Sequence, residues 1–218
     1  TAVPSGDVSA ATAAARIQGD NSSNHLGYGL AMADLDADGV ADLVMGAPRE
    51  SVGAFRGGAV FVVSGPIASG TAGEAFTVAD SVMYGTSSSG NAGFAIAEAG
   101  DQDGDSLTDV VIGAPGWSSD FGAVYLASGP TAGATRPLSR SVRLQATVYG
   151  RHGAQVDGGG DLDGDGQADL LIGAPYRTWG ASSQAGAVFT VLGPVTADTT
   201  LAAVGTAMGG GTASGLMG

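Results

Sequence analysis

Short apolar runs recur along the chain, and glycine, proline or aspartate bounds each of them. Three of these runs end in Gly-Ala-Pro, namely "DLVMGAP" (42–48), "DVVIGAP" (109–115) and "DLLIGAP" (169–175). About ten residues later comes a second set, "GAVFVVSGP" (58–66), "GAVYLASGP" (122–130) and "GAVFTVLGP" (186–194). Runs of this length, rich in valine and isoleucine and punctuated by turn residues, predict short β-strands.

Two further segments precede each Gly-Ala-Pro run and complete a repeat. Small-residue segments come just before it, namely "GYGLAMA" (27–33), "GFAIAEA" (93–99) and a degenerate "HGAQVDG" (152–158). Strand-like pieces ending in glycine come earlier, namely "ARIQG" (15–19), "SVMYG" (81–85) and "ATVYG" (146–150), with a further copy, "LAAVG" (201–205), near the end. Each repeat therefore reads as four short antiparallel strands, which is typical of a β-propeller blade. The alanine-rich first strand suits the crowded axis of a propeller, and solenoid repeats are usually shorter.

The repeats predict an all-β chain with a simple organisation. We expect an N-terminal extension at 1–14, three repeats within 15–205 (about 15–75, 76–140 and 141–205), and the start of a further repeat or a flexible tail at 206–218. Propellers typically have four to eight blades, so three blades are too few for a closed ring. We therefore expect either a fragment of a longer propeller or a protomer that completes its ring with another chain, most simply as a homodimer.

Composition narrows the function classes. The 218 residues include 39 glycines, which disfavour long helices, and no cysteine, which excludes a disulfide scaffold. The net charge of −13 excludes a nucleic-acid binder that works through a general basic surface. No apolar run approaches the ~18 residues that predict a membrane span.

The acidic residues are concentrated in one loop of each repeat. Twelve of the 21 acidic residues lie in three D-x-D-x-D-x-x-x-D loops: Asp34, Asp36, Asp38 and Asp42; Asp101, Asp103, Asp105 and Asp109; Asp161, Asp163, Asp165 and Asp169. Position 6 is Gly39, Ser106 or Gly166, and position 7 (Val40, Leu107, Gln167) can offer a backbone carbonyl. Alternate carboxylates of a tight loop converge, and Ca²⁺ takes six to eight oxygen ligands in irregular geometry.

The alternative is an exposed turn rich in Asp and Gly that binds no metal. Three copies in register beside apolar strands argue against it, because clustered carboxylates repel one another and desolvation penalises their charge. We therefore expect three Ca²⁺ sites. An EF-hand loop would carry Glu at position 12, where this chain has Met45, Ile112 and Ile172. The segment 158–166 is similar to an RTX nonapeptide, which here does not repeat in tandem.

The order of an aromatic-Gly pair, an Asp loop, an apolar run and Gly-Ala-Pro resembles the FG-GAP repeat of integrin α-subunit β-propellers and their bacterial relatives. The resemblance covers residues 15–205 and implies a four-stranded blade with Ca²⁺ in the hairpin between its first two strands, held by the twelve aspartates. The chain departs from the pattern at the aromatic-Gly pair, where it has Tyr28-Gly29, Phe94-Ala95 and His152-Gly153, and at the loop glycine, where it has Ser106.

In that family the Ca²⁺ loops lie on one face, and partners tend to bind the opposite face. The loops that build this opposite face carry candidate binding residues, Arg49, Arg56, Trp117, Tyr176, Arg177 and Trp179. Aromatic and arginine side chains are common interface anchors. The alternative for the two tryptophans is packing between blades, which we expect for Phe55 and Phe121.

The sequence therefore predicts a secreted or cell-surface Ca²⁺-binding propeller module that binds a protein or glycan ligand in adhesion and is not an enzyme. Two alternatives remain open, a Ca²⁺-stabilised scaffold and the accessory propeller domain of a secreted hydrolase. Against catalysis, the chain lacks Cys and Lys, and neither His25 nor His152 lies in a G-x-S-x-G or H-E-x-x-H motif.

Overall fold

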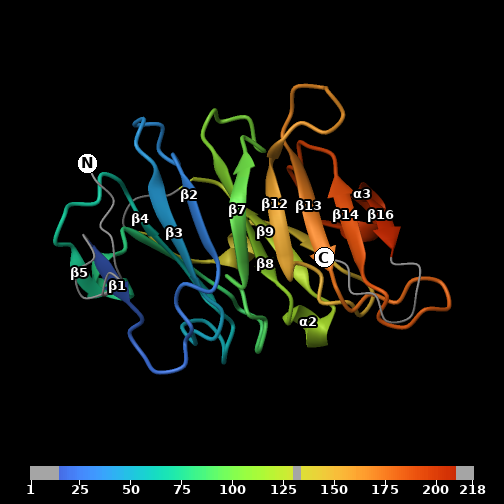
Figure 1. Ribbon diagram of the computed structural model, residues 1–218, viewed down its shortest axis with the longest axis horizontal. Coiled ribbons are helices and arrows are strands. Elements are labelled where there is room, and N and C mark those ends of the chain that lie inside the picture. Colours follow the sequence, from blue (N-terminus) through green and yellow to red (C-terminus); the bar gives the residue numbers. More distant parts are fainter. Residues whose placement is uncertain (1–14, 130–133, 210–218) are drawn as a thin grey trace, which may run out of the picture.

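The computed structural model describes residues 15–129 and 134–209, and its regular secondary structure is mainly short β-strands joined by loops. Three antiparallel sheets follow one another along the chain and stand side by side (Figure 1). Their first strands, β2 (Leu30–Ala33), β7 (Ala95–Gly100) and β12 (Gln155–Gly160), are neighbours in space. The arrangement is an open arc of propeller blades, which confirms the predicted fold class.

Each blade contains the four antiparallel strands that the sequence predicts. Blade 1 continues from β2 with β3 (Asp42–Ala47), β4 (Ala59–Val63) and β6 (Ser81–Tyr84). Blade 2 continues from β7 with β8 (Asp109–Ala114), β9 (Ala123–Ala127) and β11 (Val142–Gln145). Blade 3 continues from β12 with β13 (Asp169–Ala174), β14 (Ala187–Val191) and β16 (Gly205–Gly209). The Gly-Ala-Pro and Gly-Ala-Val segments pair in one register, with Ala47 opposite Ala59, Ala114 opposite Ala123 and Ala174 opposite Ala187.

Short parallel strands, which the sequence did not predict, connect successive blades. Strand β10 (Thr135–Pro137), which precedes the last strand of blade 2, pairs with β6 of blade 1, and β15 (Thr199–Thr200), which precedes the last strand of blade 3, pairs with β11 of blade 2. Likewise β5 (Ala72–Glu74) pairs with β1 (Arg16–Gln18). A single helical turn follows each of them, α1 (Ala75–Val78), η2 (Leu138–Arg140) or α3 (Leu201–Val204). Blades 2 and 3 therefore each add an edge strand to the last strand of the blade before them.

Two of the predicted outer strands were wrong. Strand β11 occupies 142–145, and Ala146 N donates to Gly122 O (3.1 Å) as Gly85 N donates to Gly58 O (2.9 Å). The segment 146–150 is therefore loop, and "LAAVG" is mostly α3, with the true strand starting at Gly205. The glycine-terminated pattern was misleading because cross-strand hydrogen bonds, and not the position of a glycine, decide which residues enter the ladder.

The aromatic-Gly position of the third repeat was also wrong, by two residues. Gly27 N, Gly93 N and Gly153 N each donate to the glycine of the matching Gly-Ala-Pro, at 2.9, 3.1 and 3.0 Å. Ala154 therefore occupies the place of Tyr28 and Phe94, and the third repeat has no aromatic ring there. His152 instead corresponds to Ala92 and is buried, with 1% exposure.

The core lies between the blades. One cluster joins blades 1 and 2 around Val60 and Ile112, and another joins blades 2 and 3 around Val124 and Ile172. The glycines of the first two Gly-Ala-Pro segments allow this approach, because a Cβ on Gly46 or Gly113 would overlap the carbonyl oxygen of the next blade's Gly93 or Gly153. No helix among the described residues has the length and apolar character needed to cross a membrane.

The second residue of each acidic loop is buried where a following blade covers it and exposed where none of the described blades does. Leu35 is 1% exposed beneath blade 2, and Gln102 is 2% exposed between blades 2 and 3. The Gln102 amide donates to Ala168 O (2.7 Å) and accepts from Val195 N (3.0 Å), so it ties blade 2 to blade 3. Leu162, the equivalent residue of blade 3, is 56% exposed. Blade 3 therefore presents to solvent a surface that blades 1 and 2 bury.

Candidate functional site

The three acidic loops lie at one end of the arc, which we call the acidic end (residues 34–42, 101–109 and 161–169). They connect the first and second strands of each blade and stand together at the top of Figure 1. The loops that follow each Gly-Ala-Pro, including α2 (Trp117–Asp120), lie at the bottom of the same view. Antiparallel strands produce this separation because alternate turns emerge at opposite ends of a blade.

The last aspartate of each loop is buried and closes the loop. Asp42, Asp109 and Asp169 are the first residues of β3, β8 and β13 and are 1–2% exposed. Their Oδ2 atoms accept hydrogen bonds from the backbone N–H of the loop's second residue, Leu35 (2.9 Å), Gln102 (2.8 Å) and Leu162 (2.6 Å). A carboxylate that accepts from buried backbone N–H groups satisfies donors that would otherwise cost free energy.

The first aspartate of each loop accepts hydrogen bonds from backbone N–H groups three to five residues further along the same loop. Asp161 Oδ1 accepts from Gly164 N (2.6 Å) and Oδ2 from Gly166 N (2.9 Å). Asp101 accepts in the same way from the third and fifth residues after it, at 2.6 and 2.9 Å. The N–H groups of Gly166 and Gly164 lower the pKa of Asp161, so its carboxylate stays ionised at neutral pH.

Each loop needs two residues with left-handed backbone. At position 6 the φ angles are +86° for Gly39, +68° for Ser106 and +88° for Gly166. Ser106 therefore adopts the left-handed conformation that its place in the pattern predicts. Position 4 makes the same demand, and there the first loop has a non-glycine residue, Ala37, at φ +60°. The first two loops each hold one side-chain-bearing residue in a strained conformation, whereas the third loop uses glycine at both positions.

The structure brings three aspartates of each loop together. Oxygens of Asp34, Asp36 and Asp38, of Asp101, Asp103 and Asp109, and of Asp161, Asp163 and Asp169 lie within 4.8 Å of one another in each group. Asp105 and Asp165 stand outside these groups, and their Oδ1 atoms accept from Leu107 N and Gln167 N at 2.8 Å. Asp38 accepts from Val40 N at 2.7 Å in the same way. Each group is an all-carboxylate set that can hold a metal ion.

The second loop carries an unsatisfied buried oxygen. Asp42 Oδ1 and Asp169 Oδ1 accept from Gly65 N (2.9 Å) and Gly193 N (2.8 Å), but Asp109 Oδ1 is buried with no hydrogen-bond partner in the described structure. Burial raises the pKa of Asp109 to about 6; the Gln102 N–H opposes this, and the charges of the neighbouring aspartates add to it. A cation in this group would satisfy the oxygen and remove the repulsion, so these residues fit a metal ion.

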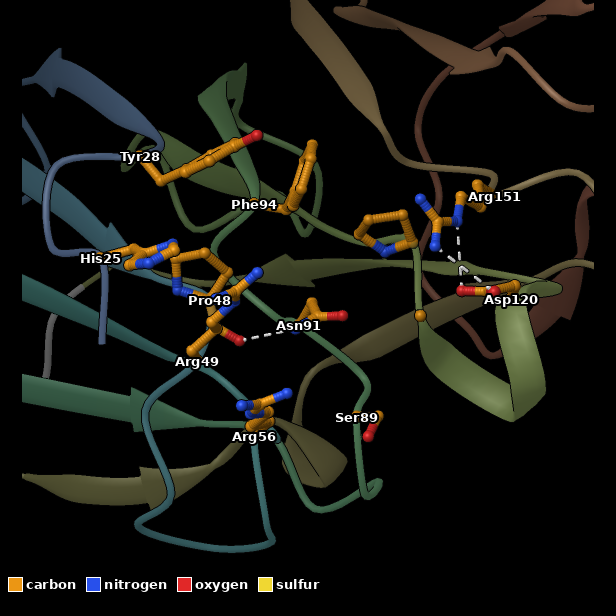
Figure 2. A pocket seen from close by; sticks show the side chains of 12 residues that line it. His25, Tyr28, Pro48, Arg49, Arg56, Ser89, Asn91, Phe94, Asp120 and Arg151 are labelled. Atoms are coloured by element: carbon orange, nitrogen blue, oxygen red, sulfur yellow. Dashed lines mark hydrogen bonds and ion pairs between the residues drawn. The ribbon is translucent and has the colours of Figure 1, made fainter. Parts of the chain in front are cut away.

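A pocket lies at the opposite end of the arc, and we call it the arginine pocket (His25, Tyr28, Arg49, Arg56, Asn91, Phe94, Asp120 and Arg151, with their neighbours). Its volume is about 440 Å³. Figure 2 shows Tyr28 and Phe94 along one wall, with ring centroids 4.4 Å apart. Arg49 and Arg56 lie on one side, and Arg151 forms an ion pair with Asp120 (3.2 Å) on the other.

Only two of the six candidate binding residues, Arg49 and Arg56, line this pocket. Trp117 is half-buried against the core between blades 1 and 2, and the Arg143 guanidinium lies 5.2 Å from its ring centroid. Trp179 packs on Gly209, where any added Cβ would overlap the indole. The tryptophans thus make packing contacts, as does the half-buried Phe121, but Phe55 is 65% exposed.

The remaining two candidates line smaller cavities of blade 3. Tyr176 lies beside Arg151, whose guanidinium is 5.4 Å from its ring centroid, in a side pocket of about 200 Å³. Arg177 lines a cavity of about 240 Å³ with Trp179 and His152. The sequence reasoning missed Arg151, His25 and the aromatic pair as pocket residues. Their signal was available, because all four lie in the segments that lead into the first strands of the blades.

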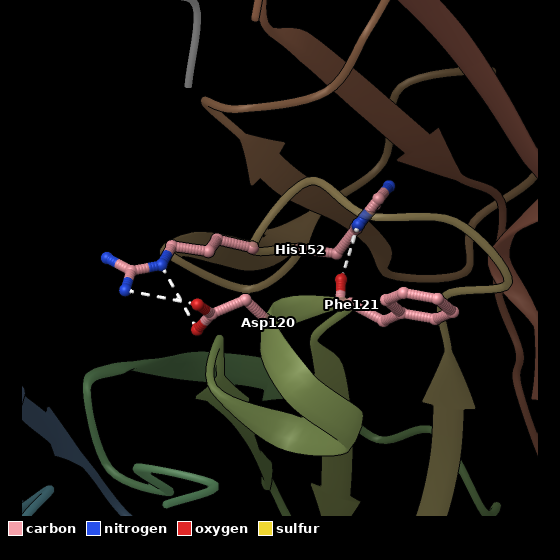
Figure 3. A network of polar contacts seen from close by, with 4 residues as sticks. Asp120, Phe121 and His152 are labelled. Atoms are coloured by element: carbon pink, nitrogen blue, oxygen red, sulfur yellow. Dashed lines mark hydrogen bonds and ion pairs between the residues drawn. The ribbon is translucent and has the colours of Figure 1, made fainter.

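A polar network fixes the far side of the arginine pocket (Figure 3). His152 Nδ1 lies 2.8 Å from Phe121 O and donates to it, since a carbonyl can only accept. The adjacent residues make the Asp120–Arg151 pair, so two contacts bind the loop after β8 to the segment before β12. Burial lowers the pKa of His152 to about 4; the Phe121 carbonyl opposes this shift and the Arg177 charge adds to it. His152 is therefore neutral at physiological pH.

Comparison with known proteins identifies the family to which the chain belongs. The FG-GAP repeat model matches residues 26–63, 95–126 and 152–191, which is about half of the chain. The chain belongs to the FG-GAP repeat family. It is 38% identical over 167 residues to human integrin alpha-X, a match that covers 73% of this chain and 14% of that protein. Mouse integrin alpha-E is 35% identical over 170 residues and Drosophila melanogaster integrin alpha-PS2 is 30% identical over 169. The chain thus spans only about a seventh of the integrin α chains that it matches.

Proposed function

We propose that this FG-GAP chain is the ligand-binding part of an extracellular adhesion protein, with Ca²⁺ in its three acidic loops and the ligand at the opposite end. The observation that supports this most directly is that the carboxylate clusters and the pocket lie at opposite ends of the blades. Carboxylates converge in the same loop of every blade, and a pocket of about 440 Å³ opens among the loops at the other end. The similarity to integrin α chains supports adhesion as the setting.

The proposed metal is Ca²⁺ because the donors are oxygens alone. Each loop would use its four aspartates, three of which already lie together, and the carbonyl of Val40, Leu107 or Gln167 would complete the shell. Ca²⁺ accepts such irregular oxygen sets, whereas Mg²⁺ requires near-octahedral geometry. Three Ca²⁺ ions would also offset six of the chain's thirteen net negative charges. Affinities on the order of 10⁻⁴–10⁻³ M are typical of extracellular modules.

We propose ligand binding without catalysis. Of the two histidines, His152 is buried and its Nδ1 is already bonded to Phe121 O, so it is poorly placed to act as a general base. The two alternatives, a Ca²⁺-stabilised scaffold and an accessory domain of a secreted hydrolase, share the same metal sites. Neither alternative accounts for Arg49 and Arg56, which face the pocket and form no ion pair with any residue that the structure describes.

We further propose that another blade, from the same protein or from a second copy, covers the exposed surface of blade 3. Leu162 is 56% exposed where its equivalents are buried, and a shallow hollow lies over Val156, Leu171 and Val188 of the same blade. Exposed apolar surface of this kind indicates an interaction site. Native mass spectrometry in Ca²⁺ would identify a second copy as the partner.

The test of this function has two parts. At ten times its dissociation constant each Ca²⁺ stabilises the folded state by about 1.4 kcal/mol, so EDTA should lower the melting temperature by several degrees. Calorimetry should count three ions per chain. Binding to arrayed matrix proteins and glycans, measured with and without EDTA, should show Ca²⁺-dependent adhesion. An unchanged melting temperature would refute the metal sites, and Ca²⁺-dependent stability without any binding would favour the scaffold.

A further inference from the structure

The arginine pocket is positively charged in a strongly acidic chain. Arg49, Arg56 and Arg151 face a single acidic residue, Asp120, so the lining carries a net charge of +2 while the whole chain carries −13. The acidic loops lie at the far end of the blades. This charge separation favours the approach of an anion to the pocket end, because local potential and not net charge directs a ligand to a concave site.

Two of the arginines are available to a ligand. Arg49 and Arg56 are exposed, and neither forms an ion pair within the described part of the chain. They belong to one loop, between β3 and β4, which the buried Glu50 anchors. The Glu50 side chain accepts from Asn24 Nδ2 and Ser51 N, and Glu50 O accepts from Gly58 N (2.9 Å). Planar guanidinium groups on an anchored loop are suited to bidentate binding of a carboxylate.

The other side of the pocket carries a carboxylate and therefore favours hydrogen-bond donors over anions. Asp120 pairs with Arg151 at 3.2 Å, and its carboxylate keeps further lone pairs that can accept hydrogen bonds. It would repel a second anionic group but bind hydroxyl donors. Between the two sides, Tyr28 (54% exposed) and Phe94 offer ring surface (Figure 2). The pocket therefore matches a ligand with one anionic end, an apolar face and hydroxyl groups at the other end.

We propose that the arginine pocket binds an acidic saccharide, a sugar ring that carries one carboxylate. The carboxylate lies against Arg49 and Arg56, the C–H face of the ring packs on Tyr28 and Phe94, and hydroxyl groups donate to Asp120. The volume of about 440 Å³ lies in the range of small-ligand sites. This inference rests on the proposed function, because it names the ligand class of the pocket end. The hydroxyl-accepting side favours a saccharide, whose ring carries several hydroxyl donors beside its carboxylate, over a peptide, whose donors next to an acidic side chain are backbone N–H groups.

The test is an NMR titration of the whole chain in Ca²⁺ with D-glucuronate, neutral D-glucose and an N-acetylated aspartate amide. Glucuronate should shift the resonances of Tyr28, Phe94 and the Arg56 loop and should bind at least tenfold more tightly than either other probe. The double variant Arg49→Gln, Arg56→Gln should weaken glucuronate binding at least tenfold. Arg140→Gln, which changes an exposed arginine outside the pocket, is the matched control and should have no effect.

Three results would overturn the proposal. They are equal affinity for glucose and glucuronate, glucuronate binding that survives the double substitution, and tighter binding of the aspartate probe, which would assign the pocket to acidic peptides. Failure here is distinguishable from failure of the proposed function. A chain that still adheres to arrayed ligands in a Ca²⁺-dependent way would keep that function with its ligand bound elsewhere, whereas loss of both Ca²⁺ stabilisation and adhesion would refute it.

Discussion

The acidic end and the arginine pocket are built from the same three repeats, yet they differ in how closely the repeats agree. At the acidic end every blade places a buried aspartate at the start of its second strand and bonds it to the second residue of the loop. At the pocket end the equivalent residues are Tyr28, Phe94 and Ala154. Each blade forms its own acidic loop, so the same residues recur in all three repeats. The arginine pocket is formed by several blades together, so each blade contributes different residues to it.

The largest expected effect is at the acidic end, where one aspartate stabilises the fold and another only binds the metal ion. Asp42→Ala would leave the buried N–H group of Leu35 and the half-buried N–H group of Gly65 without an acceptor, so the free energy of unfolding should fall by about 3 kcal/mol even in EDTA. Asp36→Ala removes an exposed carboxylate and is the matched control. It should leave stability in EDTA unchanged and abolish only the Ca²⁺-dependent part. Urea unfolding in EDTA and in Ca²⁺ measures both, and equal losses for the two variants would contradict the division of roles.

The pocket end should show its own pH dependence through His152. The pKa of His152 is about 4 in the folded state and near 6.5 when unfolded, so the unfolded chain binds the proton more tightly. Stability should therefore be full above pH 6.5 and fall by about 3 kcal/mol as the pH drops to 4.

The control for this titration is His152→Leu, which places at this position the residue found at Leu26 in the first repeat. The difference in unfolding free energy between the two proteins, measured in EDTA from pH 7.5 to 4, isolates the histidine. Other groups, such as Asp109 with its raised pKa, cancel in that difference. A difference that does not vary with pH would show that His152 is accessible to protons in the folded protein.

The smallest expected effect distinguishes the three acidic loops from one another. Ser106 holds φ at +68°, and left-handed backbone costs a non-glycine residue on the order of 1 kcal/mol. Ser106→Gly should therefore tighten Ca²⁺ binding at the second loop by about fivefold, because the loop then reaches its binding conformation more easily. Ala37→Gly should act in the same way on the first loop alone. Site-resolved NMR titration measures each loop separately, and unchanged affinity at the second loop would show that Ser106 is not strained.

The sequence by itself determined the blade and its acidic loop, because both depend on short-range patterns. Alternation of apolar runs with glycine and proline located the second and third strands of each blade, and the spacing of aspartates located the loop, including the left-handed residue Ser106. These features involve residues close together in the chain, where hydrogen-bond geometry and side-chain periodicity leave few options.

The tertiary structure alone decided the remaining features, all of which join distant segments. The parallel strands β10 and β15 are short and polar, and only pairing with the preceding blade makes them strands. The outer strands of blades 2 and 3 were misplaced because a nearby glycine was mistaken for the end of a strand. The arginine pocket gathers Arg49, Arg56 and Arg151 from loops about a hundred residues apart. No local sequence pattern predicts that these arginines lie close together, because the packing of one blade on the next brings their charges together.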